Sequence, residues 1–246
     1  MARPNNPDYE LFESGILARL SNMDSGYGPA IVLRGIDFEA RAGEVALITG
    51  PAAAGKTTLQ HVLRLALTPH VGRAVIMGVD VGRARATTRA HVKRRIGYVA
   101  ENPTFIEQWT AFDNIAMPLR MTGKKPREYV EDVRELVDFV GLGDAAELTI
   151  DKLSGAERHR AAIARALASK PDLILADDPT SGMGPSDGRR IVRLLAEMRR
   201  VGAGVVITSQ DETLFDAAPM IRWRIERGRL SQVDTAAPEE AQEAFK

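Results

Sequence analysis

The nine residues 50–58, Gly-Pro-Ala-Ala-Ala-Gly-Lys-Thr-Thr, constrain the fold of this chain more than any other stretch. They match the phosphate-binding loop pattern, in which two glycines are separated by four residues and followed by Lys and Thr. In such a loop the backbone N–H groups surround the phosphates, Lys56 supplies a positive charge, and the Thr57 hydroxyl helps to hold Mg²⁺. The predicted nucleotide-binding residues of this loop are Gly50, Pro51, Ala52, Ala53, Ala54, Gly55, Lys56, Thr57 and Thr58.

The residues on either side of the loop favour ligand binding over a glycine-capped turn that binds nothing. Residues 44–49 form a strand-like apolar run before the loop. The helix that opens at Gly55 would direct its positive end at the phosphates. Apolar residues at helical spacing follow it, namely Leu59, Val62, Leu63 and Leu67.

The overall composition argues against several functions. The 246 residues include 33 Lys and Arg and 33 Asp and Glu, so no global charge favours nucleic acid as the main partner. The absence of cysteine rules out disulfides and a thiol nucleophile within this chain. Residues 1–8 lack the apolar core of a signal peptide, and no run reaches the ~18 apolar residues that span a bilayer. We therefore expect any membrane role to go through a partner.

Alternating strand and helix patterns predict an α/β fold with an N-terminal antiparallel β part, a mixed sheet and a helical insert. Residues 1–12 are expected to be flexible, residues 13–232 to form one domain with a helical subdomain at 102–155, and residues 233–246 to be an acidic tail. Helices are predicted at 112–121, 127–140, from 154, at 186–201 and near 214. Strands are predicted at 16–21, 36–40, 73–80 as a hairpin, 96–99, within 171–179, 205–208 and 220–226.

Two carboxylates follow the apolar run within residues 171–179. Mg²⁺ that bridges the phosphates of a nucleotide needs a hard oxygen ligand from a neighbouring strand, and Asp177 is predicted to supply it. Asp178 would then point towards the γ-phosphate and orient or deprotonate the attacking water. The alternative is that these two acids only cap a helix.

Two further features are ambiguous when taken alone. Ser154 followed three residues later by Glu157 forms a capping box, which by itself predicts only the start of a helix. Tyr27 lies in a turn upstream of the phosphate loop, where it would either stack on a purine base or pack on its own turn.

The order of these elements resembles the nucleotide-binding subunits of ATP-binding cassette (ABC) systems, from about residue 16 to residue 230. The resemblance implies that ATP lies between the phosphate loop of one copy and the signature segment of a second copy in a head-to-tail homodimer. By the same resemblance, Tyr27 takes the adenine-stacking position. The signature segment, which would face the partner's ATP, comprises Leu153, Ser154, Gly155, Ala156 and Glu157.

Within this family, residues 102–123 most resemble the cell-division ATPases of the FtsE type, whose partner is the integral membrane protein FtsX. Lipoprotein-releasing and macrolide-type exporters share much of this segment. In such proteins a nearby groove receives a short helix of the membrane partner. Phe105, Trp109 and Phe112 are predicted to be exposed anchors for that helix, the alternative being that they belong to the local core.

Four positions depart from the family pattern. Asp178 stands where a glutamate is usual, and its side chain is shorter by about 1.5 Å, which predicts slow hydrolysis because a misplacement of about 1 Å can cost about a hundredfold in rate. Gln210 replaces a histidine and cannot carry a proton. Glu101 replaces a metal-sensing glutamine, where a carboxylate would either ligate Mg²⁺ or repel the phosphates. Gly184 replaces an aspartate that communicates between the two sites.

The resemblance implies ATP and Mg²⁺ as ligands and leaves three functions open. The main one is the ATPase of an FtsEX-like complex at the cytoplasmic face of the membrane, where ATP-driven dimerisation regulates septal cell-wall hydrolysis. The second is the ATPase of a lipoprotein-releasing or macrolide-type exporter, and the third is an ATP-binding switch without turnover. A soluble cassette that acts on nucleic acid is disfavoured by the balanced charge.

Overall fold

The computed structural model describes residues 7–211 and 220–233. Its larger sheet has six strands in the order β10-β9-β3-β8-β7-β6, with β10 antiparallel to β9 and the other neighbours parallel. Parallel pairing brings the carboxyl ends of these strands to one edge. The strands are β3 (Val45–Thr49), β6 (Ile96–Val99), β7 (Leu173–Asp177), β8 (Gly204–Ser209), β9 (Ile221–Glu226) and β10 (Arg229–Gln232).

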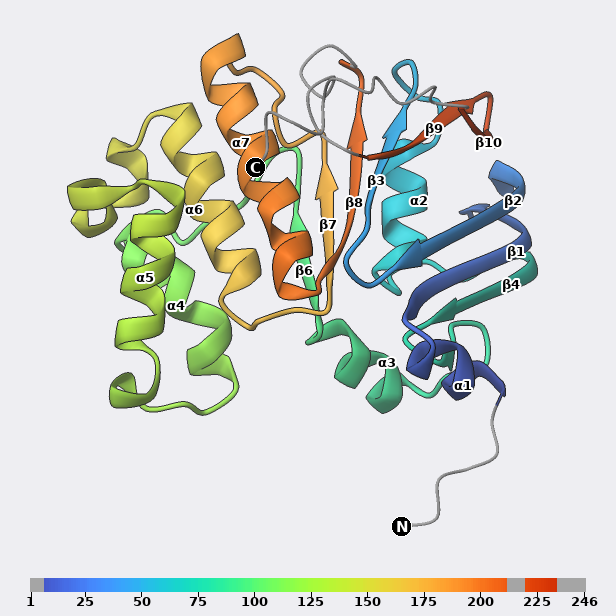
Figure 1. The fold of residues 1–246 in the computed structure, drawn as a ribbon, viewed down its shortest axis with the longest axis horizontal. Helices are drawn as coiled ribbons and strands as arrows, with labels where there is room; N and C mark the ends of the chain where they lie inside the picture. The colour runs from blue at the N-terminus through green and yellow to red at the C-terminus, as the bar shows by residue number, and fades with distance from the viewer. Residues whose placement is uncertain (1–6, 212–219, 234–246) are drawn as a thin grey trace.

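Helix α2 (Lys56–Leu63) lies between this sheet and a four-stranded antiparallel sheet of order β2-β1-β4-β5, as Figure 1 shows. Leu59, Val62 and Leu63 of α2 are fully buried there and belong to one core cluster with residues of both sheets. This packing fixes the direction in which the start of α2 points. The strands of the smaller sheet are β1 (Ile16–Tyr27), β2 (Ala30–Arg41), β4 (Val71–Ile76) and β5 (Val79–Asp80).

A second core cluster joins the other face of the six-stranded sheet to the helical part of the chain. In α5 the side chains of Val133, Val137 and Val140 are buried on one face, and Gly141 ends the helix with φ +69°. The longer helices of this part, seen together in Figure 1, are α4 (Ala111–Met121), α5 (Val130–Val140), α6 (Gly155–Leu167) and α7 (Pro185–Glu197). Short helical turns are η1 (Pro126–Glu128), η2 (Gly143–Glu147), η3 (Ile150–Lys152) and η4 (Met198–Val201).

The predicted α/β architecture is confirmed, and the differences concern the sheet edges, the N-terminal residues and a helix at residues 86–93 that was not predicted. Strands expected at 16–21 and 36–40 each extend to twelve residues, because β1 and β2 pair with each other around a tight turn at Gly28. Strand β10 was not expected. It carries little apolar pattern of its own and pairs with β9 across a turn at Gly228, so its partner rather than its sequence defines it.

The expectation of a flexible segment over residues 1–12 is wrong for residues 7–12, which belong to helix α1 (Pro7–Glu13). Asp8 is buried and pairs with Arg73 at 2.6 Å, and the Arg95 guanidinium lies 4.8 Å above the ring centre of Phe12. Both partners, Arg73 and Arg95, are distant from α1 in the chain. Local composition therefore could not reveal this docking. A further helix, α3 (Ala86–Lys93), lies between β5 and β6 in the chain.

Two sequence expectations lie outside the described residues: the short helix near 214 and the acidic tail after 233. Within the residues that the structure describes, no helix is long and apolar enough to cross a membrane.

Asn114 in α4 holds the segment that leads from β6 to that helix, and it is fully buried. Its side-chain oxygen accepts from the Ile106 N–H at 2.9 Å, and its amide donates to the carbonyls of Ile106 and Thr110 at 3.1 and 3.0 Å. The same segment carries Glu101, so its shape bears on the site described below.

We predict that Asn114→Ala lowers the free energy of unfolding by about 3 kcal/mol, because it leaves buried backbone groups without partners. Urea denaturation of the purified chain measures this. The matched control is Asn102→Ala, on the same segment but exposed, which should change stability by less than about 0.5 kcal/mol. Equal effects of the two substitutions would contradict the prediction.

Candidate functional site

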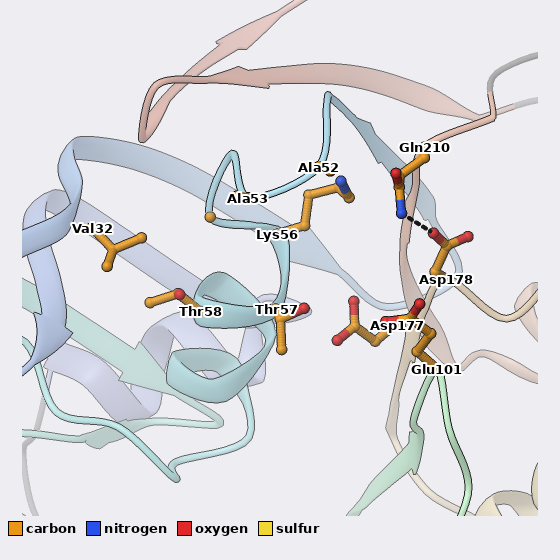
Figure 2. Close-up of a pocket in the computed structure, with 11 residues that line it drawn as sticks. Val32, Ala52, Ala53, Lys56, Thr57, Thr58, Glu101, Asp177, Asp178 and Gln210 are labelled. Atoms are coloured by element: carbon orange, nitrogen blue, oxygen red, sulfur yellow. Dashed lines mark hydrogen bonds between the residues drawn. The ribbon is translucent and has the colours of Figure 1, made fainter. Parts of the chain in front are cut away.

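A pocket of about 320 Å³ lies at the carboxyl edge of the six-stranded sheet, between the phosphate loop and the ends of β6, β7 and β8 (Figure 2). Ten of its eleven lining residues were predicted from the sequence as site residues. The exception is Val32, which reaches the loop because β2 packs across it. The lining residues are Val32, Ala52, Ala53, Gly55, Lys56, Thr57, Thr58, Glu101, Asp177, Asp178 and Gln210.

Two glycines allow the phosphate loop to pass close to neighbouring strands. A Cβ on Gly50 would lie 2.2 Å from the backbone oxygen of Ile225, so no other residue fits there without a shift of the backbone. Gly55 has φ +110°, and a Cβ there would lie 2.8 Å from a methyl carbon of Leu33. The glycine spacing is thus required by the packing of the loop against β2 and β9 as well as by phosphate binding.

Lys56 lies over the loop with little exposure, and its ammonium donates to the backbone oxygens of Gly50 and Pro51 at 2.8 and 2.9 Å. Burial lowers the pKa of Lys56, and the carboxylates of Asp178, Asp177 and Glu101 act in the opposite direction. The side chain is therefore a tethered cation in a pocket that also holds three acids. A phosphate group bound to this loop would meet a charge already in place.

Ala53 adopts φ +60°, in the left-handed region that disfavours residues with a Cβ. For an alanine such a conformation costs on the order of 1 kcal/mol. Ala52 next to it is not among the described residues with positive φ, so the strain is confined to one position of the pair.

Three hard oxygen donors, Thr57, Glu101 and Asp177, line the same pocket, and Figure 2 shows the acids gathered opposite Thr57. These donors suit Mg²⁺. The described residues contain no group of three or more His, Cys, Asp or Glu that would hold a metal alone. A cation here would therefore need other ligands as well, as Mg²⁺ does when it shares the oxygens of a nucleotide.

The carboxylate of Asp177 is buried and is held by its neighbours. The Thr208 hydroxyl donates to its Oδ1 at 2.7 Å, and the Tyr98 hydroxyl also bonds to it. Burial, followed by the charge of Asp177, raises the pKa of Tyr98 to about 12. The Tyr98 hydroxyl therefore stays protonated at neutral pH and remains a donor to the carboxylate.

The two predicted catalytic residues Asp178 and Gln210 contact each other. The Gln210 amide donates to Asp178 Oδ2 at 3.1 Å, drawn as the dashed line in Figure 2, and the Ser209 hydroxyl lies 3.3 Å from Oδ1. Asp178 has φ +42°, a conformation that non-glycine residues seldom adopt. A strained backbone and two hydrogen bonds thus set the position of this carboxylate.

None of residues 153–157 lines the pocket. The capping box is confirmed: Ser154 begins α6, its hydroxyl accepts from the Glu157 N–H at 3.3 Å, and the Glu157 carboxylate accepts from the Ser154 N–H at 2.8 Å. The Ser154 hydroxyl also donates to the Glu157 carboxylate at 2.7 Å, and this bond, followed by the one from the Ser154 N–H, lowers the pKa of Glu157. Within one chain, the signature segment forms a helix start that is separate from the phosphate loop.

Tyr27 is also absent from the pocket lining, and the role in base stacking stays a prediction. It is 48% exposed, and its hydroxyl lies 2.9 Å from Nδ1 of His61 on α2. The ring is therefore accessible from one side and tethered on the other.

The prediction of three exposed aromatic anchors is wrong for Phe105 and Phe112, which are half-buried and pack against the core. Trp109 is 36% exposed, with Arg120 5.7 Å from its ring centre. Phe105 supports the Arg165 guanidinium at 4.5 Å. The aromatic spacing alone did not distinguish a docking surface from a core.

A groove of about 570 Å³ lies between the start of β6 and helices α4 and α6, and none of these three aromatic residues lines it. Met121 of α4 is 79% exposed at its edge. The groove combines apolar side chains with cationic ones, namely Met117, Pro118, Leu119 and Met121 with Lys93, Arg94, Lys124 and Arg165.

A phosphate loop that opens a buried helix, beside a strand that ends in an acid, defines a nucleoside-triphosphate-binding protein of the α/β class. Comparison with known proteins narrows this class, because the chain matches the family model described as ABC transporter over residues 33–181. The chain belongs to the ABC transporter family as an ATP-binding subunit.

Its relatives are of several kinds. The chain is 34% identical over 212 residues to an uncharacterized ABC transporter ATP-binding protein of Thermotoga maritima, covering 86% of this chain and 90% of the relative. It is 36% identical over 189 residues to the lipoprotein-releasing system ATP-binding protein LolD of Hyphomonas neptunium, covering 76% and 83%. It is also 36% identical over 200 residues to the methionine import protein MetN 1 of Rhodococcus jostii, covering 81% and 59%.

A solved structure confirms the predicted fold. The dimeric post-hydrolysis state of an ATP-binding cassette bound to ADP and Pi superposes with a TM-score of 0.79 at 25% identity, covering 89% of this chain and 99% of that chain. The predicted membership of the ABC ATPases is thereby confirmed as well.

We predict that Ala53→Gly raises the free energy of unfolding by about 0.5–1 kcal/mol, because Gly adopts φ > 0 without strain. Thermal or urea unfolding without nucleotide measures the change. Ala52→Gly is the matched control and should lower stability by about 0.5 kcal/mol, since it only adds freedom to the unfolded chain. A loss of stability in Ala53→Gly as large as in the control would contradict the strain.

Proposed function

We propose that this chain is the ATP-driven subunit of a membrane complex of the lipoprotein-releasing type, located at the inner face of the membrane through its partner. The observation that carries the proposal is the likeness to LolD proteins, which extends over about four fifths of the chain. The methionine importers match a smaller share of their own length. LolD therefore supports the function better than MetN does.

A role in cell division with an FtsX-type partner is the second candidate. It rests on the resemblance of residues 102–123, and the relatives reported above favour lipoprotein release instead. Purification of the complex from membranes in detergent, followed by mass spectrometry, separates the two. A subunit with the sequence of a lipoprotein-releasing permease supports the first, and an FtsX-type subunit supports the second.

In this proposal, Lys56 and the N–H groups of the loop bind the phosphates of ATP, and Thr57, Asp177 and Glu101 hold Mg²⁺. The metal, when bound, neutralises charge on the phosphates. The signature segment of a second copy completes the site, because the positive end of α6 and its N–H groups would approach the γ-phosphate. ATP thus closes a head-to-tail homodimer, whose movement the membrane partner uses.

We also propose that hydrolysis is slow. The Asp178 carboxylate is withdrawn by one methylene relative to a glutamate and already accepts hydrogen bonds from Gln210 and Ser209. Gln210 cannot accept a proton from it in the way that a histidine would. The groups that bind ATP are complete, whereas those that position the attacking water are weakened.

We predict that Asp178→Glu raises the ATPase rate at least about tenfold, because the longer side chain brings the carboxylate about 1.5 Å nearer the γ-phosphate. Phosphate release from the purified chain, with and without its membrane partner, measures the rate. Lys56→Ala, which should abolish ATP binding, identifies contaminating activity, and Asp138→Glu at an exposed position of α5 is the matched control. An unchanged rate in Asp178→Glu would show that Asp178 does not limit turnover.

The groove beside α4 and α6 is the proposed docking surface of the membrane partner. Exposed Met121 gives it an adaptable apolar edge, and the four cations around it suit a segment with acidic side chains. The half-buried Phe105 would support this groove through Arg165, which lies over its ring, whereas Phe112 packs against the core.

We predict that Met121→Asp reduces co-purification of the membrane partner at least about tenfold, because a charge replaces an apolar contact beneath the docked segment. Val201→Asp is the matched control, since Val201 on η4 is 77% exposed and does not line the groove. Circular dichroism verifies the fold of both variants. Equal retention of the partner by Met121→Asp and wild type would place the docking surface elsewhere.

A further inference from the structure

A chain of buried polar groups runs from α2 to Asp177 through an otherwise apolar core. Gln60, one turn after Thr57 on α2, is fully buried. Its amide nitrogen lies 3.3 Å from Thr208 Oγ1 and 3.2 and 3.3 Å from the backbone oxygens of Ala176 and Val206. Its Oε1 is buried without a hydrogen-bond partner among the described residues.

An unpartnered buried oxygen is unfavourable by about 1–3 kcal/mol, and a leucine of similar size would avoid that loss. The orientation of the amide is nevertheless determined, because the oxygens of Ala176 and Val206 accept hydrogen bonds only. The nitrogen must face them, and its two hydrogens are shared among these two oxygens and Thr208 Oγ1, which lies within hydrogen-bond distance of it. A side chain that is kept in the core at this cost calls for an explanation beyond packing.

The hydrogen bonds of Thr208 have a defined direction. Its single hydroxyl proton has two possible acceptors, Asp177 Oδ1 at 2.7 Å and the Ala176 oxygen at 3.4 Å, and the shorter contact identifies Asp177. The Gln60 N–H occupies the other side of the hydroxyl oxygen. The Thr208 hydroxyl thus cannot turn freely, and it presents its proton to the carboxylate.

Asp177 is held from its other side as well. Tyr98 lies on β6, opposite Leu175 of β7, and its hydroxyl bonds to Asp177. The Arg64 guanidinium, 4.5 Å above the ring centre, holds the Tyr98 ring in turn. A carboxylate has about four lone-pair directions, so two hydroxyl donors leave about two of them available to a cation.

We propose that Gln60, Thr208 and Tyr98 are positioning residues that hold Asp177 for Mg²⁺. Gln60 and Thr57 lie on one helix, so the connection from Gln60 through Thr208 also fixes the spacing between Asp177 and Thr57, two of the three proposed metal ligands. This rests on the proposed role of Asp177 and Thr57 in metal binding. These hydrogen bonds orient a ligand of the metal, whereas Lys56 and the backbone of the loop make the contacts with phosphate.

The test measures binding of a fluorescent ATP analogue to the full-length chain while Mg²⁺ is titrated, and again in EDTA. We expect Thr208→Val to raise the Mg²⁺ concentration at half-maximal effect about tenfold, as removal of a supporting group around a metal ligand typically does. Affinity in EDTA should stay within about twofold of wild type, because the phosphate loop is unaltered. Thr208→Ser keeps the hydroxyl and should restore the Mg²⁺ response to within about twofold.

Two further variants complete the set. Gln60→Leu should raise the Mg²⁺ requirement by a smaller factor, about threefold, because the Thr208 hydroxyl still reaches Asp177. Tyr98→Phe removes the second donor and should act like Thr208→Val, whereas Tyr129→Phe in the helical part is its matched control and should leave the Mg²⁺ response unchanged. Should Thr208→Val fail to fold, Thr208→Ala makes the same comparison with Thr208→Ser.

Two outcomes overturn the proposal. One is a Thr208→Val chain with the wild-type Mg²⁺ response, and the other is an equal loss of affinity with Mg²⁺ and in EDTA, which would indicate a packing role. A wild-type chain whose ATP binding ignores Mg²⁺ would instead refute the proposed metal site itself. The result of this experiment does not depend on which membrane partner or which substrate the complex has.

Discussion

The burial of α2 between two sheets is the constraint on which the site depends. Because Leu59, Val62 and Leu63 fill the space between the sheets, the helix can neither slide nor rotate, and its first residues stay at the carboxyl edge of the parallel strands. Strand β7 ends at that edge, so its acids arrive opposite the loop although the chain separates them by more than a hundred residues. Apolar packing, which carries no chemistry itself, thus determines where the charged groups meet.

Features that depend on neighbouring residues in the chain could be predicted from the sequence, whereas features that depend on contacts between distant residues could not. The glycine spacing of the loop, the capping box at Ser154 and the acid after β7 depend on neighbours in the chain, and each was predicted. Helix α1 depends on the pairing of Asp8 with Arg73, 65 residues away, and Val32 reaches the pocket only through the packing of a distant strand. No local pattern encodes such contacts. The prediction for Phe105 and Phe112, which follow β6, was wrong for another reason: composition does not distinguish an exposed anchor from a core residue.

In the proposed function, this chain supports the binding of ATP better than its cleavage. The grip on phosphate is built from glycines that fit no larger residue, a tethered Lys56 and a firmly held Asp177, and it tolerates local strain at Ala53. The groups beside it are a shortened acid and an amide bonded to each other. A subunit of this kind suits a complex in which the closed, ATP-bound state does mechanical work for longer than a fast ATPase would allow.

The separation between the pocket and the signature segment at 153–157 has a genetic consequence. If a second copy completes the site, every closed dimer contains two composite sites. Each of them combines the phosphate loop of one copy with the signature segment of the other. A damaged phosphate loop or a damaged signature in one copy then spoils one of the two sites and spares the other. A copy damaged in both halves spoils both sites of any pair it joins, so the more severe allele, when expressed beside the normal one, behaves as dominant.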